Sequence, residues 1–201
     1  MQKRRQNETE KTRVYVDTNV LQGAISGRNT QDIVFIDKAK EKDCKVYTSI
    51  YTLMELLDIA KDRKFLMKSV IDKWVDVATF LQERKAKNLS KDDLDDLTTK
   101  LNNFFLHNKI IEFINIKETD WELVKKIGES SNLHSSDALH LVTAWAGNCH
   151  VLITHDSEFI KEGNRILKKE KVYDKLRICD VNDIEDTIKE LMPRVRLTDA
   201  L

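Results

Sequence analysis

The chain has 201 residues, of which 41% are hydrophobic and 34% charged, a composition typical of a globular domain rather than a disordered chain. Its 34 basic and 34 acidic residues balance, which excludes a generally basic nucleic-acid-binding protein, so any such contact must come from local patches. No apolar run approaches the roughly 20 residues needed to cross a bilayer, and three widely separated cysteines form no zinc-binding pair. We therefore expect a soluble, cytoplasmic protein with reduced thiols and no membrane partner.

Strand and helix patterns alternate along the first third of the chain. A basic tail over residues 1–12 precedes a β-branched and aromatic run at residues 13–18, which predicts a first strand. Residues 30–42 have the apolar spacing of a helix. Residues 45–49 predict a second strand, and residues 51–63 predict the helix that follows it.

Residues 64–108 interrupt this alternation with two apolar stripes at helical spacing. The first stripe is formed by Leu66, Val70, Trp74, Val77 and Leu81. The second follows a capping box that begins at Ser90, and it is formed by Leu94, Leu97, Leu101 and Phe104 or Phe105. We predict a single domain of residues 1–201 with a long helical hairpin inserted in it. This hairpin has two open roles, a contact in a dimer or a lid over the functional face.

Alternation resumes in the second half of the chain. Residues 110–116, 150–154 and 176–180 are candidate strands. Capping patterns open one helix at residues 119–122 and another at Ser135. Strands that alternate with helices predict an α/β fold whose central, mainly parallel sheet is covered on both faces, which makes three α/β/α layers.

Four carboxylates stand at structurally suggestive places in these predicted elements. Asp17 and Asp156 each follow a strand, at the edge where ligands collect in an open parallel sheet. Asp137 lies in the first turn of a helix, and Glu55 lies in an otherwise apolar helical run. Taken singly, each has a structural explanation: a helix cap for the two strand-end aspartates, the helix dipole for Asp137, and a paired surface position for Glu55.

Taken together, the four carboxylates point to metal binding. Converging carboxylates repel one another, and a divalent cation removes that repulsion. Sites built from aspartate and glutamate oxygens suit Mg²⁺ or Mn²⁺. Two such ions can position the attacking water and the leaving oxygen of a phosphodiester.

Four segments also resemble the sequence blocks of the PIN-domain family, in that family's order. They are VYVDTNVL (14–21), TLMELL (52–57), SDALHLVTA (136–144) and VLITHDSEF (151–159). The resemblance spans residues 14–160, with the 64–108 hairpin longer than is usual in the family. It implies a flavodoxin-like three-layer fold and cleavage of single-stranded RNA that depends on Mg²⁺ or Mn²⁺. It also implies that the metal-binding, catalytic residues are Asp17, Glu55, Asp137 and Asp156.

Further residues gain expected roles from the same resemblance. Asn19 and Thr154 would orient the carboxylates through hydrogen bonds. Glu158 stands where many family members have an additional acidic residue, and an exposed helix position is its alternative. His140 shares a helix face with Asp137, and we interpret it as a packed helix histidine rather than a metal ligand.

The expected reaction is in-line attack by a metal-activated water on phosphorus, without a covalent enzyme intermediate. Phosphate contacts supply most non-specific affinity for nucleic acids, so RNA binding requires local bases. The candidates for this contact are Lys3, Arg4, Arg5, Arg28, Arg194 and Arg196.

Two other functions remain open from the residues alone. A phosphatase of the haloacid-dehalogenase type requires a second aspartate two residues after Asp17, but position 19 is asparagine. A catalytically silent PIN-like module that binds RNA or protein would be expected to lack part of the acidic quartet, which is complete here. Within the nuclease interpretation, a VapC-type toxin would have an antitoxin partner, an RNA-processing nuclease would not, and a homodimer is a further expected partner state.

Overall fold

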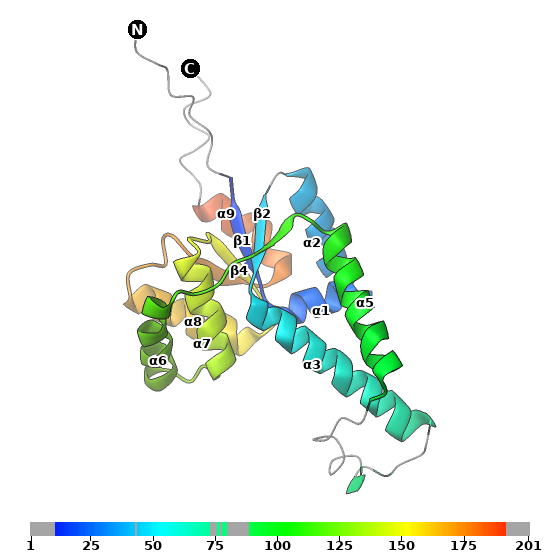
Figure 1. The fold of residues 1–201 in the computed structure, drawn as a ribbon. Helices are drawn as coiled ribbons and strands as arrows, with labels where there is room; N and C mark the ends of the chain where they lie inside the picture. Colours follow the sequence, from blue (N-terminus) through cyan, green and yellow to red (C-terminus); the bar gives the residue numbers. More distant parts are fainter. Residues whose placement is uncertain (1–10, 43, 73–75, 77, 80–88, 192–201) are drawn as a thin grey trace.

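The computed structural model describes residues 11–42, 44–72, 76, 78–79 and 89–191 of the chain. Within these residues, five parallel strands form a central sheet in the order β3-β2-β1-β4-β5 (Figure 1). The strands are β1 (Arg13–Val16), β2 (Lys45–Thr48), β3 (Ile111–Phe113), β4 (Val151–Ile153) and β5 (Arg177–Cys179). Each strand lies within a predicted strand segment, so the prediction of a parallel sheet is confirmed.

Helices cover both faces of the sheet, which confirms the three-layer α/β/α architecture (Figure 1). One face carries α1 (Thr18–Ser26), α2 (Thr30–Glu41), α3 (Ile50–Leu66), α5 (Lys91–His107) and α9 (Ile184–Leu191). The other face carries α6 (Trp121–Ser130), α7 (Ser135–Ala146) and α8 (Ser157–Lys169). No helix in the described part of the chain is both long and apolar enough to span a membrane.

Alternate residues of β1 enter the two layers, because successive side chains of a strand point to opposite faces. Val14 and Val16 pack in the core that contains α1 and α2, whereas Tyr15 packs in the core that contains α7 and α8. All three side chains are fully buried. Full burial of an aliphatic or aromatic side chain contributes about 1.5–3 kcal/mol to the stability of the fold. The side chains of β1 therefore stabilise the packing of both helical layers on the sheet.

Strand β1 lies where the direction of chain progression reverses, with β2 on one side and β4 on the other. In an open parallel sheet, ligands bind in the crevice beyond the carboxyl ends of the strands that flank such a point. Asp17 directly follows β1, and residues 154–156 directly follow β4. The topology therefore places two of the predicted acidic segments at the edge where a ligand site is expected.

Helix α3 extends past residue 64, where the predicted hairpin begins, and much of the predicted first arm lies outside the described residues. Helix α3 continues into the π-helical turn η1 (Met67–Asp72), because neither glycine nor proline interrupts residues 50–72. Helix α5 returns alongside α3 (Figure 1). Lys64 and Lys68 both pair with Asp93 near the start of α5, which holds the two arms together.

The two apolar stripes of this segment differ in how far they are described. In the first stripe Leu66 is exposed. The side chains of Val70, Trp74, Val77 and Leu81 lie outside the described residues. In the second stripe Leu97 and Leu101 are buried against α3 and the sheet, as expected for the inner face of an amphipathic helix.

Two helices begin at positions that the sequence did not predict. Residues 18–26, for which no element was predicted, form α1 because the Asp17 side chain caps this helix. The capping box predicted at Thr119 and Glu122 is wrong. The backbone N–H of Lys117 donates to the Asp120 carboxylate at 2.7 Å, which makes the 3₁₀ turn η2 (Glu118–Asp120), and α6 begins only after it.

Candidate metal centre

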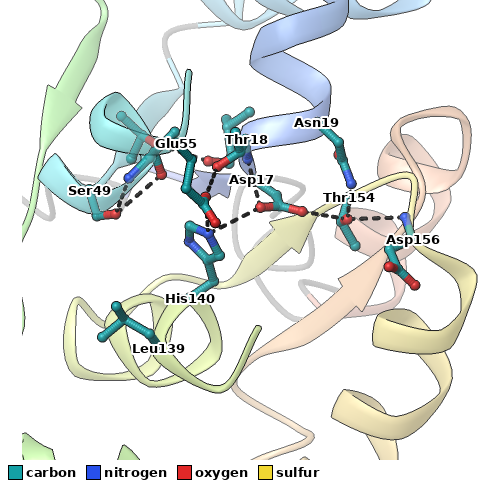
Figure 2. A network of polar contacts seen from close by, with 12 residues as sticks. Asp17, Thr18, Asn19, Ser49, Glu55, Leu139, His140, Thr154 and Asp156 are labelled. Atoms are coloured by element: carbon teal, nitrogen blue, oxygen red, sulfur yellow. Dashed lines mark hydrogen bonds and ion pairs between the residues drawn. The ribbon is translucent and has the colours of Figure 1, made fainter. Parts of the chain in front are cut away.

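Asp17 stands at the junction of β1 and α1, in the middle of the polar network in Figure 2. Its backbone N–H donates to the carbonyl oxygen of Ile153 at 3.1 Å, which places Asp17 beside the end of β4. Its carboxylate accepts from the backbone N–H of Thr18 at 2.6 Å and so caps α1. The side chain is buried, so its negative charge depends on such donors.

Glu55 reaches the same place from α3 (Figure 2). Its carboxylate accepts hydrogen bonds from the Thr18 hydroxyl and from His140 Nε2, the latter at 2.9 Å. Burial opposes ionisation of Glu55, but these hydrogen bonds outweigh burial and lower its pKa. Glu55 is therefore an ionised, inward-pointing carboxylate and not a paired surface residue.

His140 of α7 is buried between these two carboxylates. Its Nε2 also lies 3.4 Å from Asp17 Oδ1, and its Nδ1 lies 2.8 Å from the Tyr15 hydroxyl. Because an ionised carboxylate can only accept, Nε2 carries the hydrogen. Burial would lower the pKa of His140, but the hydrogen bond to Glu55 and the charge of Asp17 outweigh burial and raise it. The histidine is packed, as interpreted from the sequence, but it is packed inside the acidic cluster.

A chain of hydrogen bonds connects Asp17 to the loop after β4 (Figure 2). Thr154 Oγ1 donates to Asp17 Oδ2 at 2.7 Å and accepts from Asn19 Nδ2 at 2.8 Å and from the Asp156 backbone N–H at 3.1 Å. Asn19 Oδ1 in turn accepts from the backbone N–H of His155 at 3.1 Å. Thr154 thus contacts Asp17 directly, whereas Asn19 acts on it through Thr154.

Asp137 of α7 and Asp156 at the start of α8 are the other two predicted ligands. With Asp17 and Glu55 they make up the acidic edge of the sheet. Asp137 lies in the first turn of α7. Asp156 caps α8, with its Oδ1 accepting from the Phe159 backbone N–H at 2.9 Å. Burial raises the pKa of Asp137, and the negative charges of Asp17 and Asp156 raise it further. Asp137 therefore lies close enough to Asp17 and Asp156 to be affected by their charges.

The remaining predicted residues lie further out. Glu158 is exposed in the first turn of α8. Arg28 is exposed immediately after Gly27, whose positive φ of 64° ends α1 in the left-handed conformation that glycine adopts without strain. Burial and the positive charge of Arg28 lower the pKa of Arg63 on α3. The other predicted RNA contacts lie outside the described residues: Lys3, Arg4, Arg5, Arg194 and Arg196.

A second polar cluster, which the sequence analysis did not identify, lies behind the loop after β4. His155 Nε2 is 2.7 Å from Asp32 Oδ1, and His155 Nδ1 is 2.8 Å from Asp180 Oδ2. Asp32 is fully buried, and a β-carbon at Gly23 would lie only 1.8 Å from Asp32 Oδ2. Asp32 and Asp180 each stand near a helix start, where aspartate is common. The sequence around them therefore does not distinguish them from ordinary helix-capping residues.

The donor set of the acidic edge fits a hard divalent cation. One potential ligand atom from each of Asp17, Glu55 and His140 lies within 4.8 Å of the other two. Carboxylate oxygens are the ligands that Mg²⁺ and Mn²⁺ prefer, and the raised pKa of Asp137 indicates negative charge that a cation would neutralise. His140 presents an N–H to Glu55, so in this arrangement it positions the carboxylates rather than offering a lone pair.

Comparison with known proteins agrees with this geometry. The family model of the PIN domain matches residues 14–163, well over half of the chain. A comparison with curated proteins finds no match. The matched range begins in β1 and ends in α8, and it includes Asp17, Glu55, Asp137 and Asp156. Because the match includes the central strands and the whole acidic edge, we conclude that the chain belongs to the PIN-domain family.

Proposed function

We propose that the protein is a metal-dependent endoribonuclease that hydrolyses phosphodiester bonds of single-stranded or structured RNA. The observation that carries the proposal is the meeting of Asp17 and Glu55 with His140 at the carboxyl edge of the sheet, where one potential ligand atom of each residue lies within 4.8 Å of the other two. The charges of Asp17 and Asp156 also raise the pKa of Asp137, which supports adding the other two predicted carboxylates to this site. Neutralising such a cluster and holding a phosphate both call for divalent cations. The PIN-domain family is a family of nuclease type, and the acidic residues that a nuclease requires are present in this chain.

Each residue of the site has a defined part in this proposal. Mg²⁺ or Mn²⁺ held by Asp17, Glu55, Asp137 and Asp156 would activate the attacking water and stabilise the leaving oxygen. Thr154 orients Asp17 through its hydroxyl, and Asn19 holds Thr154 in that orientation. His140 donates to Glu55 and keeps it ionised.

The direct test is cleavage of an end-labelled single-stranded RNA with Mg²⁺ or Mn²⁺. Asp17→Asn and Asp137→Asn each remove a charged ligand, and we expect kcat/KM to fall roughly 100-fold or more, about 2.7 kcal/mol of transition-state stabilisation. Asp186→Asn is the matched control, because the Asp186 side chain is 82% exposed on α9. Metal-dependent cleavage that survives both site substitutions would remove these residues from the mechanism. Hydrolysis of a small phosphate ester without action on RNA would favour a phosphatase.

Arg28 is proposed to contact the RNA backbone. It is exposed and its charge lowers the pKa of Arg63, and neither residue has an ion pair with a carboxylate within the described residues. Two guanidinium groups without a counter-charge attract phosphate. The Arg28→Ala variant should bind RNA more weakly, and the slope of log K against log salt should decrease by about 0.7 for one lost contact to a single strand.

The matched control for Arg28 is Arg165→Ala. Arg165 is also exposed, but both its Nε and its NH2 group donate to Glu162, so its charge is already compensated. The slope should remain that of the wild type in this variant. Equal salt slopes for Arg28→Ala and the wild type would show that Arg28 makes no phosphate contact.

Two cellular roles are proposed for such a nuclease, that of a toxin and that of an RNA-processing enzyme. A VapC-type toxin acts with an antitoxin partner and arrests growth when it is expressed alone, whereas an RNA-processing nuclease needs no antitoxin. Expression of the wild type and of Asp17→Asn distinguishes the two, since only an active toxin arrests growth. Sedimentation of the purified protein tests the proposed homodimer.

A further inference from the structure

Tyr51 forms part of an apolar surface at the start of α3, directly beside the acidic cluster. Its side chain is 37% exposed, and its ring centroid lies 5.5 Å from that of His140 with the planes inclined at 53°. Ile50 and Met54 next to it are 52% and 56% exposed. Residues three and four apart share a helix face, so Met54 adjoins both Tyr51 and Ile50. Three large, partly exposed apolar side chains thus lie within the first turns of one helix.

Contact with His140 brings Tyr51 to the carboxylates. The ring of Tyr51 lies against that of His140, whose Nε2 is 2.9 Å from Glu55 Oε2 and 3.4 Å from Asp17 Oδ1. Glu55 is also the next residue along the same helix face, one turn after Tyr51. The ring therefore extends from the acidic cluster towards solvent, and contact with His140 accounts for only part of its surface.

We propose that Tyr51, with Met54 beside it, is a stacking platform for an unpaired base of the substrate, adjacent to the phosphate that is cleaved. This inference rests on the proposed function. Carboxylates beside the ring repel an acidic ligand unless divalent cations are present. Nucleic acid is the ligand that offers both phosphates for such cations and planar, weakly polar bases for an aromatic ring.

The platform selects the form of the substrate rather than its sequence. Every base has a stacking face, so stacking on an aromatic side chain tolerates all four bases. Bases in a helix are already stacked on their neighbours, whereas those of a loop or a single strand can be splayed onto the protein. Tyr51 therefore favours unpaired segments of RNA over continuous duplex.

The test compares a normal single-stranded RNA with one that lacks a single base next to the cleaved phosphate. We expect Tyr51→Ala to raise KM for the normal RNA about 5- to 100-fold, the range that corresponds to loss of one stacked base. The RNA that lacks the base should be cut with the same KM by Tyr51→Ala and by the wild type. Tyr51→Phe keeps the ring and should retain the difference between the two RNAs.

Two controls separate stacking from indirect effects. Trp121→Ala removes an aromatic side chain that is 50% exposed on α6, and KM should not change. Binding of Mn²⁺ is measured for Tyr51→Ala, because contact with His140 and Glu55 gives Tyr51 a route to the metal ligands. A loss of Mn²⁺ affinity together with an equal loss on both RNAs would overturn the stacking proposal.

The stacking proposal can fail independently of the proposed function. If the wild type cuts RNA and Tyr51→Ala cuts it with unchanged KM, the nuclease stands and the platform is refuted. If the wild type does not cut RNA, the proposed function fails. Fluorescence of a 2-aminopurine-labelled oligonucleotide then tests whether a base stacks on Tyr51. Quenching by the wild type that is lost in Tyr51→Ala supports the platform, and equal fluorescence with both proteins refutes it.

Discussion

Asp137 is the residue where electrostatic repulsion in the site is clearest. Burial and the negative charges of Asp17 and Asp156 raise its pKa above the value in an unfolded chain. The folded state therefore binds this proton more tightly than the unfolded state does. As a result, ionisation of Asp137 destabilises the fold at neutral pH. This destabilisation decreases as the pH falls below the raised pKa and is absent below the pKa of the unfolded chain.

Asp137→Asn should consequently stabilise the metal-free protein at pH 7. Since Asp137 is partly exposed, we expect a gain below about 1 kcal/mol, or up to about 2–4 °C in Tm for a chain of this size. Mn²⁺ should reverse the order, because binding to the folded state stabilises the wild type more than the variant. Calorimetry in EDTA and in Mn²⁺ measures both effects. A variant that is less stable than the wild type in EDTA would contradict the repulsion at Asp137.

Individual residues of the site differ in how far the sequence predicted them. The positions of Asp17 and Asp156 after strands were predicted, because a strand and its end are local patterns. The place of His140 between Asp17 and Glu55 was not, since the hydrogen bond from His140 to Glu55 joins residues 85 positions apart. The contact between Tyr15 and His140 likewise depends on how α7 packs on the sheet.

At the scale of elements, the start of α5 is a case in which sequence and structure agree. The Ser90 hydroxyl accepts from the Asp93 backbone N–H at 3.2 Å, and the Asp93 carboxylate accepts from the Ser90 N–H at 3.2 Å. This is the capping box that the sequence predicted. It satisfies two backbone N–H groups at the helix start, in the place where Lys64 and Lys68 also reach Asp93.

Ser90→Ala should reduce the free energy of unfolding by about 1 kcal/mol, because one N–H at the start of α5 loses its acceptor. Urea denaturation measures the change as a lower midpoint with an unchanged m-value. Thr98→Ala is the matched control within the same helix. Among the described residues, the Thr98 hydroxyl donates to the Leu94 carbonyl oxygen of its own helix, so its loss should change stability by less than about 0.5 kcal/mol. Equal midpoints for Ser90→Ala and the wild type would show that the box does not stabilise α5.

Element boundaries were harder to predict than the elements themselves. Apolar spacing predicted a boundary near residue 64 within residues 50–72, yet α3 and η1 run through that position without interruption. No helix was predicted over residues 18–26, although α1 begins there. Both errors arise because helix propensity varies little between neighbouring residues, while tertiary packing decides where a helix ends.

At the scale of the whole molecule, the three cysteines report on how tightly the layers pack. The three cysteines form no disulfide. Cys149 and Cys179 are buried beside the sheet, and burial raises their pKa values to about 12 and about 11. Cys44 is only partly buried at the start of β2. Two of the three cysteines are therefore buried, and the third is partly accessible to solvent.

The rate of thiol alkylation should follow the difference in burial between Cys44 and the other two cysteines. The thiolate is the reactive form, so Cys149 and Cys179 should resist iodoacetamide at pH 8 while the protein is folded. We expect one adduct in the native protein and three in guanidinium chloride, counted by intact mass spectrometry, with the native adduct on Cys44. Rapid modification of Cys149 under native conditions would mean that the layer of α7 opens easily from the sheet.

The sequence by itself determined the five strands and the three layers, because strand alternation and helix capping are patterns within a few residues of one another. It also predicted four acidic site positions from their places in these elements. Only the tertiary structure decided that His140 lies between Asp17 and Glu55, that His155 lies between Asp32 and Asp180, and that Tyr51 borders the acidic edge. The contact from Asp32 to His155 spans 123 positions. Such contacts follow from the packing of α2, α3 and α7 on the two faces of one sheet, and no local pattern in the chain specifies that packing.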